Sequence, residues 1–145
     1  MTKIKLCGLR KVEEIKIVNQ WKPDMIGFVF ARESKRYVDP ETAALLKRNL
    51  DPAIRAVGVF VNEDADKIVS LLESGVIDLA QLHGNEDASY LKKLREKTKK
   101  PLIQAVRAVD RMVLKAAEQS TADYIMADSL SHIAHADKTN PSLHT

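Results

Sequence analysis

Short apolar stretches alternate along this chain with longer segments in which apolar residues recur at helical spacing. The apolar stretches predict strands over residues 4–7, 25–30, 54–61, 79–83, 102–107 and 124–128. The amphipathic segments predict helices that begin near Lys11, Pro40, Asp64, Glu86 and Asp110. Strands that alternate with helices indicate parallel neighbours joined by right-handed crossovers. A closed barrel and an open doubly wound sheet both fit this alternation.

Local signals place several helix ends. Asp39 is expected to cap a helix whose first residue is Pro40, because proline is well tolerated at that position. Asp64 is expected to cap the next helix. Gly75 lies where a glycine commonly ends a helix.

Composition narrows the class of protein. A chain of 145 residues with 45% apolar and 30% charged residues fits one ordinary globular domain. The net charge of +3 comes from lysines spread over helical segments, and only 5% of residues are aromatic, so we expect no nucleic-acid partner. The single cysteine excludes an intrachain disulfide, and no apolar run is long enough to cross a membrane. The charged start is not typical of a signal peptide, so we predict a cytoplasmic protein without membrane contacts.

Residues that can carry chemistry gather where the predicted strands end. Cys7 ends the first strand and Asp128 ends the sixth, and a base and an acid at two strand ends are how a βα barrel builds an active site. The other polar residues near strand ends are Arg32, Lys35, Arg36, Asn62, Gln81, His83 and Arg107. The amino ends carry plainer residues, and ligands of parallel sheets bind outside the carboxyl ends.

Cys7 has two interpretations. Side chains alternate along a strand, so Cys7 shares a face with Lys3 and Lys5, and a nearby ammonium favours the reactive thiolate. Gly8 lets the chain turn away without covering the sulfur. A lone cysteine is nevertheless more often an inert buried residue.

The other candidates also have structural alternatives. Asp128 could be a reactive carboxylate or the cap of a following helix. His83 could move a proton, contact a substrate or simply end a strand. Arg36 could bind a carboxylate through two hydrogen bonds or be an ordinary loop arginine. His132 and His135 lie one helical turn apart without a third ligand, so we predict no metal site.

Taken together, the segments resemble the phosphoribosylanthranilate isomerase family, tryptophan-pathway enzymes with a (β/α)₈ barrel. They occur in the family's order across residues 3–129. The matching segments are Lys5-Leu6-Cys7-Gly8-Leu9, Gly27-Phe28-Val29-Phe30 with Ser34-Lys35-Arg36-Tyr37-Val38, Val57-Gly58-Val59-Phe60-Val61-Asn62, Gln81-Leu82-His83-Gly84 and Ala127-Asp128-Ser129.

The resemblance implies an Amadori rearrangement of N-(5-phosphoribosyl)anthranilate to 1-(2-carboxyphenylamino)-1-deoxyribulose 5-phosphate. Asp128 matches the family's general acid and Cys7 its general base. Arg36 matches the residue that holds the anthranilate carboxylate, and Gln81 and His83 lie on the segment that lines the substrate pocket. No cofactor or metal is implied.

The chain departs from the family pattern after residue 129. No glycine follows Gly84, so the family's glycine-rich phosphate-binding loop is not found. We predict an incomplete TIM-type barrel of about six of the eight βα units over residues 1–129, then an irregular or disordered tail over residues 130–145. Open strand edges would favour a homo-oligomer, and weaker phosphate binding would reduce substrate affinity.

Three hypotheses therefore stay open from the sequence. The first is an isomerase with an altered carboxyl end. The second is a non-catalytic, degenerate barrel fragment that self-associates through its open sheet edges. The third is a different sugar-phosphate barrel or an open-sheet binding protein with the same polarity of strand ends.

Overall fold

The computed structural model describes residues 3–83, 86–107 and 121–128, which form an alternating α/β chain. The strands are β1 (Lys5–Cys7), β2 (Met25–Val29), β3 (Arg55–Phe60), β4 (Leu79–Leu82), β5 (Leu102–Arg107) and β6 (Tyr124–Asp128). The helices are α1 (Val12–Trp21), α2 (Pro40–Asn49), α3 (Ala65–Glu73) and α4 (Ala88–Lys97). The helix predicted near Asp110 and the tail predicted over residues 130–145 lie outside the described residues.

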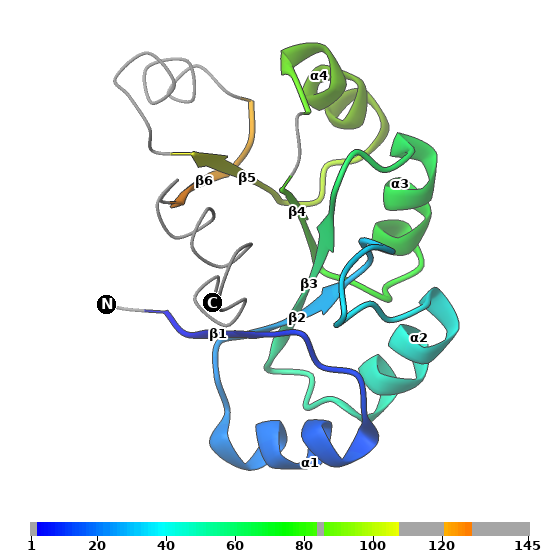
Figure 1. The fold of residues 1–145 in the computed structure, drawn as a ribbon, viewed down its shortest axis with the longest axis vertical. Coiled ribbons are helices and arrows are strands. Elements are labelled where there is room, and N and C mark those ends of the chain that lie inside the picture. The colour runs from blue at the N-terminus through cyan, green and yellow to red at the C-terminus, as the bar shows by residue number, and fades with distance from the viewer. Residues whose placement is uncertain (1–2, 84–85, 108–120, 129–145) are drawn as a thin grey trace.

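All six strands are parallel and pair in chain order, from β1 to β6. The sheet curves into an arc, and α1 to α4 lie along its convex side (Figure 1). A doubly wound sheet reverses its strand order at a switch point, and this sheet does not. The barrel-type winding is therefore confirmed, and the described strands form a half-barrel.

The predicted strands agree closely with the observed ones. β5 and β6 have the predicted bounds, and the other four predictions extend one residue too far at one or both ends. Some of these extra residues, such as Phe30 and His83, still donate a backbone hydrogen bond to the neighbouring strand, although they lie outside the strand bounds. Element ends of this kind depend on hydrogen bonds that composition alone does not specify.

Aspartates cap the starts of α2, α3 and α4. Asp39 Oδ1 accepts from the Thr42 backbone N–H at 2.7 Å, directly before Pro40. Asp64 caps α3 in a similar way, and Asp87 caps α4. Each cap satisfies an N–H group that has no partner inside its own helix.

Gly75 ends α3 as predicted. Its φ of +82° lies in the left-handed region that glycine adopts without strain. Its backbone N–H donates to the Leu72 carbonyl at 3.2 Å, and the Val76 N–H donates to the Leu71 carbonyl at 3.1 Å. This pair of bonds is the Schellman arrangement, which turns the chain from α3 toward β4.

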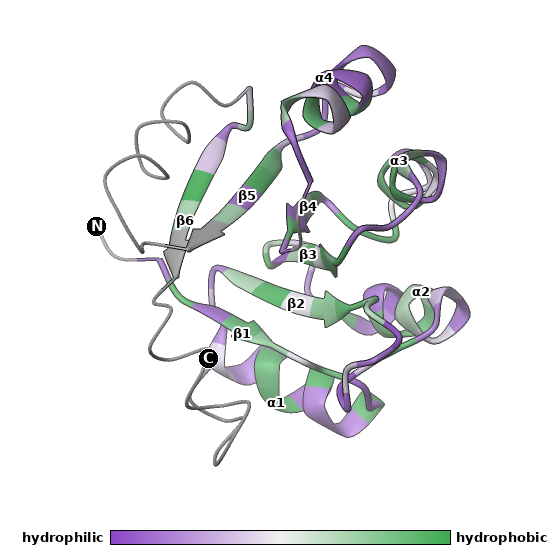
Figure 2. Cartoon of the chain, turned by 45° about the horizontal axis from the view of Figure 1, so that its top comes forward, coloured by the Kyte–Doolittle hydropathy of each residue, from purple (hydrophilic) through white to green (hydrophobic). Residues whose placement is uncertain are grey.

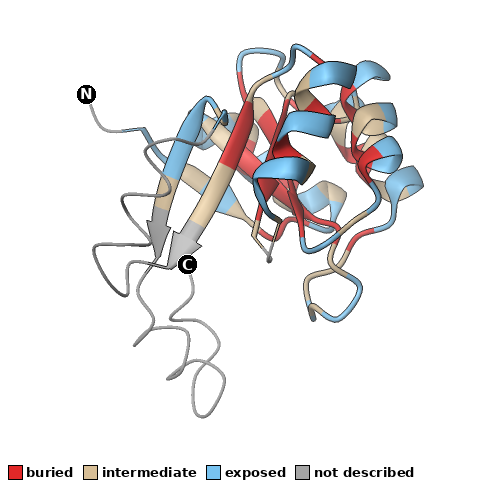
Figure 3. Ribbon diagram, turned by 90° about the horizontal axis from the view of Figure 1, so that it is seen from above, coloured by how far each residue is buried: buried red, intermediate tan, exposed pale blue. Residues whose placement is uncertain are grey.

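The main core lies between the sheet and the helices. Outward-facing strand residues such as Phe28 and Phe60 pack there against Ile68 and Leu72 of α3. Figure 2 shows the helices with their apolar sides toward the sheet, and Figure 3 shows the buried residues concentrated in this layer. A smaller cluster of Val57, Leu79 and Ile103, with Met25 and Met126 against it, lies on the concave face.

We expect Gly58→Ala to lower the free energy of unfolding by about 1–3 kcal/mol, because overpacking a filled core strains its neighbours. A methyl group at Gly58 would lie 2.7 Å from Ile77 Cδ1 and 2.9 Å from Phe60 Cε2. Urea denaturation followed by circular dichroism measures the change. Leu45→Ala, at an exposed position of α2, is the control and should stay within about 0.5 kcal/mol of the wild type. Equal stability of Gly58→Ala and the wild type would contradict this packing.

Candidate active site

The site is built on the edge of the sheet at which all strands end. We call this edge the carboxyl-end rim; its strand-terminal residues are Cys7, Val29, Phe60, Leu82, Arg107 and Asp128. In a parallel barrel this edge is where ligands bind, because the loops that leave the strands surround it.

Cys7 is half-buried at the end of β1, and two glycines make room for it. Gly27 of β2 pairs in register with Cys7, and a Cβ at Gly27 would lie 2.7 Å from the Cys7 sulfur. Gly8 has a φ of +90°, and its N–H donates to the Gly27 carbonyl at 2.9 Å. The chain thus turns away from the rim directly after the thiol, as its sequence predicts.

Arg36 reaches Cys7 from the loop after β2. Its Nη1 donates to the Cys7 carbonyl oxygen at 3.4 Å, and its aliphatic part lies where a side chain at Gly8 would be. The Ser34 hydroxyl accepts from the Arg36 backbone N–H at 3.1 Å and helps to shape the loop. The thiol and the guanidinium, 29 residues apart in sequence, therefore share one part of the rim.

A line of polar groups crosses the concave face from β1 to β4. Lys5, on the same face of β1 as Cys7, donates from Nζ to Gln81 Oε1. Gln81 is only 3% exposed, and its amide nitrogen lies 3.3 Å from His83 Nδ1. An amide nitrogen can only donate, so this contact is a hydrogen bond in the His83 tautomer whose Nδ1 accepts and whose proton is on Nε2.

The Lys5–Gln81 bond was not predicted from the sequence. Three strand spacings separate β1 from β4 along the sheet, which is about 14 Å on a flat sheet. The two side chains meet only because the sheet is curved. The one available signal was a lysine within an apolar strand that shares its face with Cys7.

Burial affects the charge of Lys5. Removal from water lowers the pKa of the Lys5 ammonium, and its electrostatic interaction with Cys7 opposes this shift. Because the folded-state pKa lies below the unfolded one, the protonated lysine costs folding free energy at neutral pH. That cost disappears as the pH rises through the unfolded value of 10.5.

Asp128 ends β6, where it pairs in register with Arg107 of β5. The side chains of these two residues are outside the described part of the structure. Of the five site residues predicted from the sequence, the structure brings Cys7, Arg36, Gln81 and His83 to one face or rim of the sheet. For Asp128 the structure describes only the backbone position at the end of β6.

Nothing in the described ranges indicates a metal centre or a membrane span. Within residues 3–83, 86–107 and 121–128, no three His, Cys, Asp or Glu side chains gather closely enough to hold a metal ion. His132 and His135 lie outside these residues. No helix among those described is both long and apolar enough to cross a membrane.

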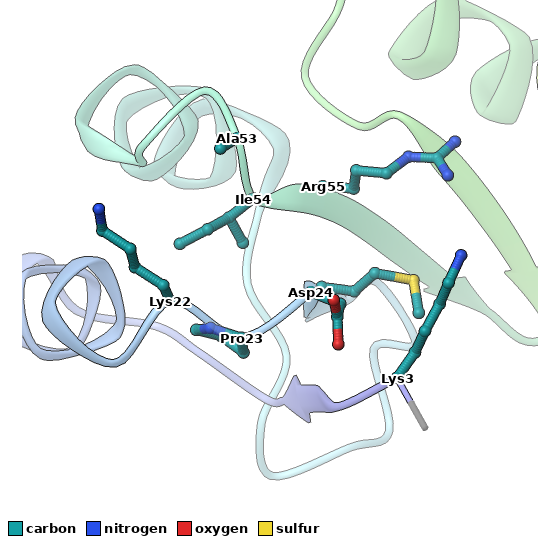
Figure 4. A pocket seen from close by; sticks show the side chains of 8 residues that line it. Lys3, Lys22, Pro23, Asp24, Ala53, Ile54 and Arg55 are labelled. Carbon is teal, nitrogen blue, oxygen red and sulfur yellow. The ribbon is translucent and has the colours of Figure 1, made fainter. Parts of the chain in front are cut away.

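A cavity of about 260 Å³ lies at the opposite end of the strands (Figure 4). Its lining residues are Lys3, Lys22, Pro23, Asp24, Met25, Ala53, Ile54 and Arg55. These residues precede or begin β1, β2 and β3, so the cavity opens at the amino ends of the strands, away from the Cys7 thiol. Barrel enzymes place their chemistry at the carboxyl ends, so the carboxyl-end rim, and not this cavity, is the candidate active site.

Relatives of this chain share one name. The family model for N-(5′-phosphoribosyl)anthranilate (PRA) isomerase matches residues 4–132. The N-(5′-phosphoribosyl)anthranilate isomerase of Endomicrobium trichonymphae is 47% identical over 131 residues, which are 90% of this chain and 64% of that protein. The enzyme of Lachnoclostridium phytofermentans is 44% identical over 129 residues, or 89% of this chain and 59% of that protein. The chain thus spans between 59% and 64% of the length of these two curated relatives.

Solved structures agree with the sequence relatives. A phosphoribosylanthranilate isomerase crystallised with reduced 1-(o-carboxyphenylamino)-1-deoxyribulose 5-phosphate matches with a TM-score of 0.78 and 30% identity, over 94% of this chain and 70% of that one. The enzyme from Thermotoga maritima matches with a TM-score of 0.77 and 30% identity, over 89% of this chain and 63% of that one. With its strand order, its rim and these relatives in agreement, the chain belongs to the N-(5′-phosphoribosyl)anthranilate isomerase family.

Proposed function

We propose that this protein isomerises N-(5′-phosphoribosyl)anthranilate to the 1-deoxyribulose 5-phosphate in tryptophan biosynthesis, as the family name implies. The observation that carries the proposal is the contact between Arg36 and the Cys7 segment at the carboxyl-end rim. A cation that can hold a carboxylate there contacts the backbone of the residue whose thiol can remove a proton. The match to a solved isomerase with a bound product analogue supports the same assignment.

The proposed reaction needs an acid and a base at the same time. Asp128 donates a proton to the ribose ring oxygen, and the C1–O bond breaks as the anthranilate nitrogen forms an iminium with C1. The Cys7 thiolate then removes the proton from C2, and the electron pair forms the enolamine. In the tautomerisation C1 gains the proton that Cys7 had taken, and the C2 hydroxyl loses its proton to the Asp128 carboxylate. This gives the ketone at C2 and returns both groups to their starting forms.

Arg36 and His83 are proposed to orient the substrate. The Arg36 guanidinium presents a fork of donors that fits the anthranilate carboxylate. Its contact with the Cys7 carbonyl would fix the ring relative to the base. The His83 tautomer described above carries its proton on Nε2, so this nitrogen can donate to a substrate oxygen. On the other side of the ring, the Gln81 amide contacts Nδ1 and holds His83 in this orientation.

We infer a cytoplasmic setting, because a free thiolate base requires a reducing environment. The proposed partner is the small phosphosugar–anthranilate substrate, without nucleic acid or membrane.

We expect Cys7→Ser and Asp128→Asn to lower kcat roughly a hundredfold to ten-thousandfold, because each removes one of the two proton-transfer groups. The decrease of anthranilate fluorescence with time measures turnover. Leu45→Ala, on the exposed side of α2, is the control and should keep the wild-type rate. A constant fluorescence signal with folded wild-type protein would contradict the proposed activity, and wild-type rates in both variants would contradict the two roles.

Arg36→Met should raise KM about tenfold to a hundredfold, because a charge-assisted hydrogen bond contributes about 1.5–3 kcal/mol to binding. Lys35→Met is the matched control. Lys35 is exposed, and its substitution removes one positive charge from the same loop. Initial rates over a range of substrate concentrations separate KM from kcat. An unchanged KM in Arg36→Met would exclude Arg36 as the carboxylate-binding residue.

We also infer self-association through the end strands. Ile4 and Leu6 at β1 and Tyr124 and Ile125 at β6 are between 41% and 57% exposed, although all four are apolar or aromatic. The Thermotoga maritima relative is described as dimeric, which supports an oligomeric state without giving its interface. Apolar strand edges are templates for pairing with another chain.

Sedimentation velocity should therefore show a sedimentation coefficient that rises with protein concentration. Leu6→Lys should shift the protein toward the monomer, because a charged edge strand resists pairing. Leu45→Lys is the matched control, because Leu45 on α2 is as exposed as Leu6, with 43% of each residue exposed. It should leave association unchanged. A wild-type monomer at every concentration would overturn this inference.

A further inference from the structure

The concave face of the sheet contains a charge that packing alone does not explain. The apolar cluster on this face consists of Val57, Leu79 and Ile103 with Met25 and Met126. Lys5 lies on this face of β1, in register with Met25 of β2. A methionine or leucine at this position would fill similar space without the cost of removing an ammonium from water.

Gln81 fixes where this charge lies. Its Oε1 accepts from Lys5, and its amide nitrogen is engaged with His83, so both ends of the buried amide are used. The flexible four-carbon stem of a lysine could also extend toward solvent, and the hydrogen bond holds it across the concave face instead. Gln81 is therefore better suited to hold Lys5 and His83 than to bind substrate directly.

Lys5 and Cys7 lie two residues apart on one face of β1, and they interact electrostatically. In an apolar, partly desolvated setting this interaction is less screened than in water. We propose that Lys5, held by Gln81, keeps a positive charge beside the Cys7 sulfur and so stabilises the thiolate form of that residue. The role of the thiolate as a base rests on the proposed function, whereas its stabilisation by Lys5 does not.

Other charged groups lie near β1, and a test has to distinguish their effect on the Cys7 thiol from that of Lys5. Those on the neighbouring elements are Lys3, Asp24, Arg36, Arg55 and His83. Lys3, Asp24 and Arg55 line the cavity at the amino ends of the strands, and Arg36 contacts the Cys7 carbonyl from the rim side. Lys3 continues the same face but lies outside β1 at the amino-end cavity, whereas Lys5 lies within β1, two residues from the thiol.

The test uses the reactivity of the sole thiol, measured without substrate. The rate of carbamidomethylation by iodoacetamide, recorded from about pH 6 to about pH 10, gives the midpoint of thiolate formation. We expect Lys5→Met to raise this midpoint by about one pH unit, because a neighbouring opposite charge typically shifts a pKa by one to three units. Lys5→Gln should raise it similarly, since it removes the charge but can still donate to Gln81. Lys5→Arg should stay close to the wild type.

Controls distinguish the effect of removing the Lys5 charge from an effect of misfolding. Lys16→Met removes the same charge from the exposed surface of α1 and should leave the midpoint unchanged. Circular dichroism verifies that each variant is folded, and Lys5→Gln carries the test if Lys5→Met does not fold. Wild-type midpoints in Lys5→Met and Lys5→Gln, or an equal rise in Lys16→Met, would overturn the proposal. Because no substrate is used, these outcomes are independent of whether the protein isomerises its proposed substrate.

Discussion

The curvature of the parallel sheet is the constraint on which the site depends. On a flat sheet the strands that carry Lys5 and Gln81 would be about 14 Å apart, and the two side chains would point in the same direction without meeting. The curved sheet turns the inner faces of β1 and β4 toward each other, and the hydrogen bond between these two side chains spans the space between them. The helices on the convex side maintain this curvature, because they bury the outward-facing residues of each strand.

The convex and concave faces of the curved sheet carry different kinds of side chain. The convex side holds large, fully buried side chains, such as Phe28 and Phe60, which stabilise the fold. The concave side holds a smaller apolar cluster and a line of polar groups that end at the rim. A partly buried lysine lowers stability at neutral pH, and we interpret its presence on this face through the thiol two residues away. Stability and chemistry are thus assigned to opposite faces of one sheet.

The sequence predicted the local features well, because they depend on residues that are near one another in the chain. Asp39 and Gly75 mark helix ends through backbone chemistry that acts over a few residues. The position of Cys7 at a strand end followed from the apolar pattern alone. The Lys5–Gln81 bond, in contrast, joins residues 76 positions apart and depends on sheet curvature and on the packing of the chain between them. Neither property can be read from spacing, although the lysine itself was an anomaly visible in the sequence.

The order of the strands was also open until the structure was known, since alternating strands and helices fit two architectures. Sequential pairing from β1 to β6 decided between them, and it is what brings the ends of β1 and β4 to the same rim as the Arg36 loop. The most direct test of the account is a crystal structure of this protein with reduced 1-(o-carboxyphenylamino)-1-deoxyribulose 5-phosphate. The account predicts the ligand at the carboxyl-end rim, with its carboxylate on Arg36 and its pentose carbons beside the Cys7 sulfur. A ligand bound in the cavity between Lys3 and Arg55 at the amino ends, with the rim empty, would contradict it.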